Sequence, residues 1–113
     1  MKTFRQNELL AAYEYAAAGE QALHLMSGAF AYGQARTPAC FKGRKQIAHL
    51  FDQDRKRLEA TARQFGVRVI RVERIGERGQ HIDLCGKPLE RALELAKQIE
   101  WETEHGLLEK EAK

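Results

Sequence analysis

Two histidines and one aspartate have the side chains that a metal site or a proton-transfer site requires. His81 and Asp83 alternate along the strand-like segment HIDLC, residues 81–85, and His49 lies in the apolar run QIAHLF. Imidazole changes its charge near neutral pH, and imidazole and carboxylate groups are common ligands of transition metals. Neither HLFD nor HID matches the spacing of a known ligand motif. The same pattern also fits the solvated side of a sheet or a protein interface, so all three interpretations stay open.

The middle of the chain is basic and forms a second candidate site. Residues 34–78 contain twelve Lys and Arg against five Asp and Glu, a local charge of +7, whereas residues 88–113 have a local charge of −3. Basic side chains give salt-dependent affinity for phosphates, and a nearby aromatic ring can stack on an unpaired base. A charged, solvated surface would show the same composition, and the segment matches no phosphate-loop or RNA-binding signature. The residues that we expect to contact nucleic acid are Arg36, Lys42, Arg44, Lys45, Arg71 and Arg74.

Hydrophobic periodicity predicts the elements that must hold these side chains in place. Residues 7–27 have apolar side chains at helical spacing, with Asn7 as the N-cap of the expected helix. Residues 28–45 show no clear period and are expected to form an ordered loop. A second helix is expected between Asp52, as its N-cap, and Gly66, where it ends. The remaining expected elements are strands at 46–51, 67–75 and 81–85 and a final helix that begins near Pro88 and ends near Glu104.

This order of elements predicts an α/β fold built on a two-layer, small mixed sheet. A βαβ unit would supply two parallel strands and a hairpin would add an antiparallel strand, with an N-terminal helix and a C-terminal helix. The opposite face from the helices would carry His49, His81 and Asp83, and the sequence leaves open whether the N-terminal helix covers it. The face that helices are expected to cover carries Ala48, Leu50, Ile70, Val72, Ile82 and Leu84.

Two further residues are interpreted from their positions in the expected helices. Trp101 falls outside the apolar stripe of the last helix, which makes it a candidate interface residue because tryptophan is enriched in protein interfaces. The competing interpretation is that the N-terminal helix covers Trp101. His24 is expected to be an ordinary surface or boundary residue of the first helix.

Length and composition set the wider limits. The 113 residues, of which 43% are hydrophobic, suit a single domain spanning residues 1–113. The first residues lack the apolar run of a signal peptide, and no stretch approaches the roughly 20 apolar residues of a membrane span. The two cysteines do not have the spacing of a metal motif. We therefore expect a cytoplasmic protein with no membrane contact and no cofactor of its own.

Three segments of the chain, AHLFDQDRKRLEATARQFGV, QHIDL and KPLERALELA, carry a resemblance that spans roughly residues 47–96. They resemble a small bacterial and phage family of unknown function, which has an HLxAD-type strand-to-helix junction, an amphipathic helix ending in GV or GL, and an HYD-type strand. The resemblance implies a fold and an association with phages or mobile elements, but no settled activity. The paired acids that usually end the family's first strand are missing here, which counts against catalysis. The matching positions are His49, Leu50, Asp52, Leu58, Gly66, His81 and Asp83.

The expected function is therefore binding rather than catalysis. We predict a small accessory protein, related to phages or mobile elements, that contacts nucleic acid or a host protein that handles nucleic acid. One alternative is a metal-dependent nuclease or phosphoesterase that uses His49, His81 and Asp83. Another alternative is a structural subunit, such as one half of a homodimer, that buries Trp101 and the polar sheet face between protomers.

Overall fold

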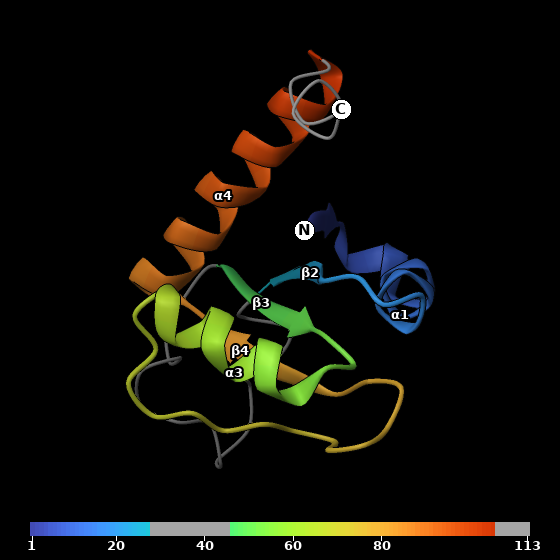
Figure 1. The fold of residues 1–113 in the computed structure, drawn as a ribbon, viewed down its shortest axis with the longest axis vertical. Helices are drawn as coiled ribbons and strands as arrows, with labels where there is room; N and C mark the ends of the chain where they lie inside the picture. Colours follow the sequence, from blue (N-terminus) through green and yellow to red (C-terminus); the bar gives the residue numbers. More distant parts are fainter. Residues whose placement is uncertain (28–45, 106–113) are drawn as a thin grey trace.

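The computed structural model of the chain describes residues 1–27 and 46–105 (Figure 1). The elements before the gap are β1 (Lys2–Phe4), the short 3-10 helix η1 (Gln6–Glu8), α1 (Leu9–Ala17) and β2 (Ala22–Ser27). The elements after it are β3 (Gln46–Phe51), α3 (Arg55–Gln64), β4 (His81–Leu84) and α4 (Gly86–Glu104).

The four strands form one mixed sheet in the order β1-β2-β3-β4. Strands β1 and β2 are parallel and are connected through α1, whereas the other neighbouring pairs are antiparallel. The register places His24 opposite His49, and His49 opposite Asp83, in one row across three strands. The predicted class is confirmed, because the fold is α/β with a mixed sheet and has an N-terminal and a C-terminal helix.

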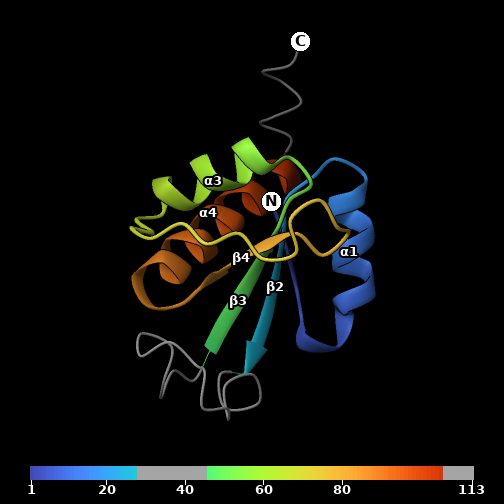
Figure 2. The ribbon, with the colours of Figure 1, turned by 90° about the horizontal axis from the view of Figure 1, so that it is seen from below.

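Helices pack on both faces of the sheet (Figure 2). Helix α1 covers part of the second face, so the fold has a third layer where we expected two, and part of the polar face is covered. The core beneath α3 and α4 contains Leu23, Ala48, Leu50, Leu58, Ala62, Ile82, Leu84 and Leu89. The smaller core beneath α1 contains Phe4, Ala12, Ala16, Ala22 and Phe51.

The predicted N-terminal helix is too long, because residues 22–27 form β2 and not its last turns. Helix α1 ends at Ala17, and Gly19 follows with φ +98°, a left-handed conformation that glycine adopts without steric cost. Strand β2 faces packed side chains on both of its sides, since Ala22 and Leu23 belong to different cores. The sequence of a strand that is buried on both faces is a continuous apolar run. Periodicity alone does not distinguish such a run from part of a buried helix.

The predicted strand at 67–75 is also wrong, because the segment makes only one isolated bridge, between Glu73 and His81. Strand β3 pairs directly with β4, and the expected parallel pairing of β3 with residues 67–75 is absent from the described residues. Arg74 has φ +53°, which interrupts the extended backbone that a strand needs, and Val69 is 82% exposed. The β-branched composition therefore predicted a strand where the chain forms an irregular connection.

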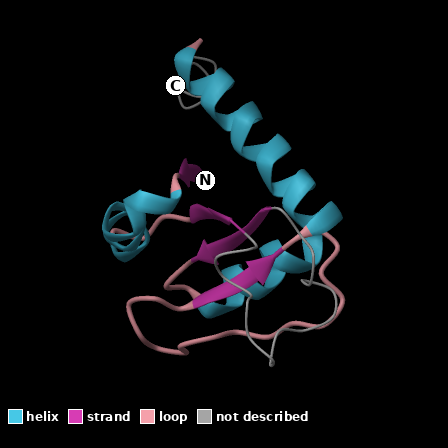
Figure 3. Cartoon of the chain, turned by 180° about the vertical axis from the view of Figure 1, so that it is seen from behind, coloured by secondary structure: helices cyan, strands magenta, loops and turns pink. Residues whose placement is uncertain are grey.

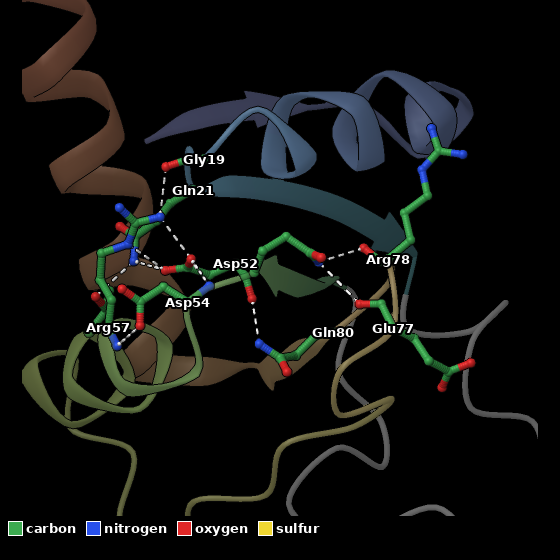
Figure 4. Close-up of polar contacts among 10 residues, drawn as sticks. Gly19, Gln21, Asp52, Asp54, Arg57, Glu77, Arg78 and Gln80 are labelled. Atoms are coloured by element: carbon green, nitrogen blue, oxygen red, sulfur yellow. Dashed lines mark hydrogen bonds and ion pairs between the residues drawn. The ribbon is translucent and has the colours of Figure 1, made fainter.

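Asp52 is not the N-cap of α3, as the sequence predicted. Asp54 fills that role, since its side chain accepts a hydrogen bond from the backbone N–H of Arg57. The Asp52 carboxylate is fully buried and makes a two-point ion pair with the Arg57 guanidinium, with both contacts at 2.8 Å (Figure 4). The backbone N–H of Asp52 donates to the Gln80 carbonyl at 3.3 Å, and the Gln80 side-chain amide donates to the Asp52 carbonyl at 2.8 Å. These contacts connect the end of β3 to the start of β4 and hold the two strands in register.

Helix α4 has Pro88 in its first turn and ends at Glu104, as predicted. It packs on the sheet as far as Glu100, which contacts Thr3 of β1, and its end extends past the sheet (Figure 1 and Figure 3). Trp101 is 49% exposed and stacks on His105 with ring centroids 4.1 Å apart, so α1 does not bury it. No helix in residues 1–27 or 46–105 has the length and apolar character needed to cross a membrane.

Candidate metal centre

The two histidines and the aspartate singled out in the sequence lie together on the face of the sheet that α1 partly covers. His49 comes from β3, and His81 and Asp83 come from β4. The Oδ1 atom of Asp83 lies 3.4 Å from Nε2 of His49 and 3.3 Å from Nε2 of His81. All three potential ligand atoms lie within 4.8 Å of one another, and all three residues are half-buried. The sequence thus predicted the members of this cluster and the sheet face that carries it.

The ring orientation of His81 is fixed by a backbone contact. Its Nδ1 atom lies 2.7 Å from the carbonyl oxygen of Gly79, which can only accept, so Nδ1 carries the hydrogen. In the neutral ring, Nε2 then presents a lone pair to the Asp83 carboxylate. Two electron-rich atoms at 3.3 Å repel each other unless a cation, either a proton or a metal ion, lies between them. Burial opposes charge on this imidazole, but the hydrogen bonds to Asp83 and Gly79 and the nearby carboxylates raise the pKa of His81.

His49 differs from His81 in its electrostatic surroundings. Burial, followed by the proximity of His81, lowers the pKa of His49 to about 4, although the Asp83 carboxylate acts in the opposite direction. The His49 imidazole is therefore neutral at pH 7 and has a lone pair to donate. Its Nδ1 atom is buried and has no hydrogen-bond partner among the described residues.

His24 is not the surface residue that the sequence predicted. It is 2% exposed, and its ring stacks on that of His49 with centroids 5.7 Å apart. Its Nε2–H donates to the Gln6 carbonyl at 3.0 Å, which leaves Nδ1 as a buried acceptor without a partner in the described part of the chain. The signal that could have found His24 is the alternation of ALHLMS, which we interpreted as helix.

A pocket of about 730 Å³ opens onto this cluster. His24, His49, Phe51 and His81 line it, whereas Asp83 contacts both His49 and His81 without lining the pocket. Pockets that bind small molecules have volumes of roughly 300–1,000 Å³. The two histidines of the cluster therefore border a cavity large enough for a small ligand. The other lining residues are Arg5, Gln6, Asn7, Leu9, Tyr13, Met26 and Arg74.

The residues predicted to contact nucleic acid do not all fall in one place. Arg74 lines the pocket, whereas Arg71 is exposed and pairs with Glu73 at 3.7 Å. Trp101 lies on α4, which packs on the other face of the sheet. Arg5, which the sequence reasoning did not single out, also lines the pocket. The predicted loop contacts Arg36, Lys42, Arg44 and Lys45 lie outside the described residues.

The geometry of the cluster suits a transition-metal ion. Ligand atoms about 2.0–2.1 Å from a zinc ion at tetrahedral angles lie roughly 3.3 Å apart. The separations from Asp83 to His49 and to His81 are 3.4 Å and 3.3 Å, longer than a typical N–H···O hydrogen bond. The Gly79 carbonyl orients His81 in the way that a backbone acceptor commonly orients a metal-bound histidine.

The chain matches no protein-family model, no curated protein and no solved structure. The resemblance of residues 47–96 therefore stays an expectation drawn from the sequence alone.

Proposed function

We propose that this protein is a metal-dependent hydrolase of phosphoester bonds, in which His49, His81 and Asp83 bind one divalent transition-metal ion. The observation that carries the proposal is the convergence of three potential ligand atoms within 4.8 Å, on residues of which two, His49 and His81, line a pocket. This function was the enzymatic alternative raised by the sequence, and the cluster favours it over binding alone.

The donor set indicates which metals suit the site. Two imidazole nitrogens and one carboxylate oxygen are typical of zinc and of other late first-row metals such as iron. Three protein ligands leave at least one coordination position for water or substrate, as catalytic sites require. A bound ion of this kind lowers the pKa of a coordinated water and polarises a phosphoryl oxygen. The chain itself contributes the neutral His49 imidazole and the orientation of His81 by Gly79.

The cations of the pocket favour a phosphoester over a neutral substrate. Arg5 and Arg74 both line the cavity that opens onto the cluster. Guanidinium groups bind phosphate oxygens through paired, charge-assisted hydrogen bonds. Arg5 also contacts Glu8, but at 3.5 Å and with 85% of its side chain exposed, so this surface pair competes weakly with a ligand.

Nucleic-acid binding without catalysis is the second proposal, and the observation that favours it is Arg74. This residue belongs to the basic set inferred from the sequence and also lines the pocket. In this proposal the protein is a cytoplasmic accessory factor, associated with a phage or mobile element, that contacts nucleic acid or a protein that handles it. A homodimer that buries Trp101 would be compatible with either function.

Calorimetric titration of the metal-free protein with zinc chloride tests the metal site. We expect one zinc ion per chain, and His81→Ala should weaken binding at least about tenfold because it removes a ligand. His105→Ala is the matched control, since His105 is exposed and its hydrogen bond and ring contact within residues 1–27 and 46–105 are both with Trp101 of α4. Circular dichroism should establish that both variants are folded. Equal zinc binding by the wild type and His81→Ala would contradict the proposal.

Hydrolysis of bis(4-nitrophenyl) phosphate, a simple phosphodiester, tests the catalytic part. The rate should depend on added zinc or manganese and should fall to background in His81→Ala, whereas His105→Ala should retain it. Metal binding without any hydrolysis of phosphodiester or phosphomonoester probes would reject the enzyme and leave the binding proposal.

A further inference from the structure

We propose that the pocket beside the metal centre binds a single nucleotide unit, with Arg74 as the anchor for its phosphate. The inference rests on the proposed function, because it names the substrate class of the same site. The nucleotide unit is either free or located at the end of a single strand, since both present the same phosphate, sugar and base.

The backbone of Arg74 is the first observation. Arg74 is the one non-glycine residue with positive φ in the described part of the chain, at +53°. A left-handed conformation is uncommon for a residue with a Cβ atom, and such outliers are frequent at ligand sites. Glycine is the residue that would adopt it without cost. The presence of arginine there points to a use for its side chain.

The surrounding turn holds Arg74 at the pocket. Glu73 and His81 exchange two backbone hydrogen bonds, of 2.8 Å and 3.1 Å, so the neighbour of Arg74 is fixed to a residue of the metal centre. The Arg74 carbonyl accepts from the N–H of Glu77 at 3.0 Å, and the N–H of Gly76 donates to the Gln80 side chain at 2.9 Å. The turn is therefore held by several hydrogen bonds, and it places Arg74 at the pocket that His81 also lines.

The Arg74 guanidinium has no ion-pair partner among residues 1–27 and 46–105. The neighbouring Arg71 and Arg78 do pair with carboxylates, Glu73 and Glu14 respectively. Arg74 is thus a cation that lines a pocket and keeps its hydrogen-bonding capacity for a ligand. An anion bound there would lie close to the metal centre, because His81 lines the same cavity.

The pocket is larger than a phosphate ion needs, and its lining includes apolar side chains and amides as well as cations. Its 730 Å³ volume exceeds what an inorganic phosphate fills, and Leu9 and Met26 supply apolar walls against which a base can pack. Gln6 and Asn7 also line the pocket, and the Asn7 side-chain amide can contact a base edge.

Calorimetry on the metal-free protein with four probes tests the inference. The probes are adenosine 5′-monophosphate, ribose 5-phosphate, inorganic phosphate and a 5′-phosphorylated single-stranded pentanucleotide. We expect the nucleotide or the pentanucleotide to bind at least about tenfold more tightly than inorganic phosphate. Tighter binding of the pentanucleotide would assign the site to strand ends, and tighter binding of the monophosphate to free nucleotides. Equal binding of all four probes, or no binding, would overturn the inference.

Arg74→Gly tests whether the Arg74 side chain binds the phosphate without disturbing the backbone conformation of the turn. Glycine accepts the left-handed backbone, so this variant should be at least as stable as the wild type and should lose nucleotide affinity about tenfold or more. Arg71→Gly is the control, since Arg71 pairs with Glu73 and does not line the pocket. Leu9→Ala should weaken binding of the nucleotide but not of inorganic phosphate. Unchanged nucleotide affinity in Arg74→Gly would reject the assignment of the anchor.

The two proposals fail in different ways. Nucleotide binding without zinc binding would reject the metal-dependent hydrolase and retain the nucleotide pocket. Zinc binding with hydrolysis of simple phosphodiesters, but without preference for nucleotides, would reject only the substrate class.

Discussion

At the scale of residues, metal binding at His49, His81 and Asp83 depends on which of their atoms carry hydrogen. The Gly79 carbonyl fixes the hydrogen of His81 on Nδ1, so Nε2 and the Asp83 carboxylate compete for one cation between them. The same carboxylate also faces His49, whose imidazole is neutral at pH 7. A proton is the cation that remains when metal is removed, and the free energy of unfolding must then depend on pH.

The metal-free protein should be most stable near pH 6.5. The pKa of His49 is lowered in the fold, so its contribution to stability is complete above the ordinary value of 6.5 and is lost as the pH falls through about 4. The pKa of His81 is raised, so its contribution is complete below 6.5 and is lost as the pH rises through the folded value. Lowering the pKa of His49 from 6.5 to about 4 limits its effect on the free energy of unfolding to about 4 kcal/mol, at about 1.4 kcal/mol per pKa unit.

Urea unfolding between pH 4 and pH 9 in the presence of a chelator measures this dependence. His49→Gln should reduce the loss of stability on the acid side, and His81→Gln should reduce the loss on the alkaline side. His49→Gln should leave the alkaline limb in place, whereas His81→Gln should also weaken the acid limb, because the proximity of His81 helps to lower the pKa of His49. If the free energy of unfolding of the wild type and of both variants had the same pH dependence, the pKa directions given for His49 and His81 would be wrong.

At the scale of elements, the sequence predicted the parts whose signals are local. Helix α3 is followed by Gly66 with φ +93°, and α4 has a clear apolar stripe, so both helices were predicted, although Asp54 and not Asp52 is the N-cap of α3 and α4 begins at Gly86. Strand β2 was missed because burial on both faces makes its sequence mostly apolar, and the alternation in ALHLMS was interpreted as the last turns of the preceding helix. Because β2 was not predicted, the sequence analysis also missed His24, which is close to the site because the register of β2 places it opposite His49.

The buried network around Asp52 is a feature that no sequence pattern indicated. Its carboxylate accepts hydrogen bonds from Arg57, from the Gln21 side chain at 2.9 Å and from the backbone N–H of Asp54 at 2.9 Å. Arg57 also donates to the carbonyl of Gly19 at 2.9 Å. The network therefore connects the turn before β2 to the junction of β3 and α3, two regions far apart in the sequence.

Arg57→Ala should lower the free energy of unfolding by about 3 kcal/mol, because it leaves the buried Asp52 carboxylate without its cation. Arg55→Ala is the matched control on the same helix, since Arg55 is half exposed and pairs with Glu59 at 3.7 Å. The control should lose less than about 1 kcal/mol. Equal losses in the two variants, measured by urea unfolding at pH 7, would show that the buried pair contributes no more than a surface pair.

At the scale of the whole molecule, the sheet separates two kinds of surface. One face lies beneath α3 and α4 and is an apolar core, and the other combines the small core beneath α1 with the pocket and its imidazoles. The sequence predicted which residues of β3 and β4 face each way, because period-two alternation is local. It could not predict that α1 would wall one side of the pocket, because that depends on the true end of α1 and on strand order.

The charge asymmetry of the chain gives a prediction at the same scale. If the basic segment contributes to nucleic-acid binding, Arg44→Gln with Lys45→Gln should lower the salt dependence of single-strand binding. The slope of log K against log salt should fall by about 1.4, at about 0.7 per phosphate contact. The control is Lys87→Gln with Lys97→Gln, two exposed cations of α4. Equal slopes for the wild type and the loop variant, from fluorescence anisotropy, would reject the role of these two cations.

The most direct measurement of the central claim is the X-ray absorption spectrum of the zinc-loaded protein. If His49, His81 and Asp83 bind the zinc ion, its first coordination shell should contain nitrogen and oxygen at about 2.0–2.1 Å, with the outer scattering of two imidazole rings. The spectrum of His81→Ala should lose one of those rings if any zinc remains bound. A first coordination shell that contains sulfur at about 2.3 Å, or a spectrum without imidazole scattering, would place the metal elsewhere in the chain and contradict the metal site at His49, His81 and Asp83.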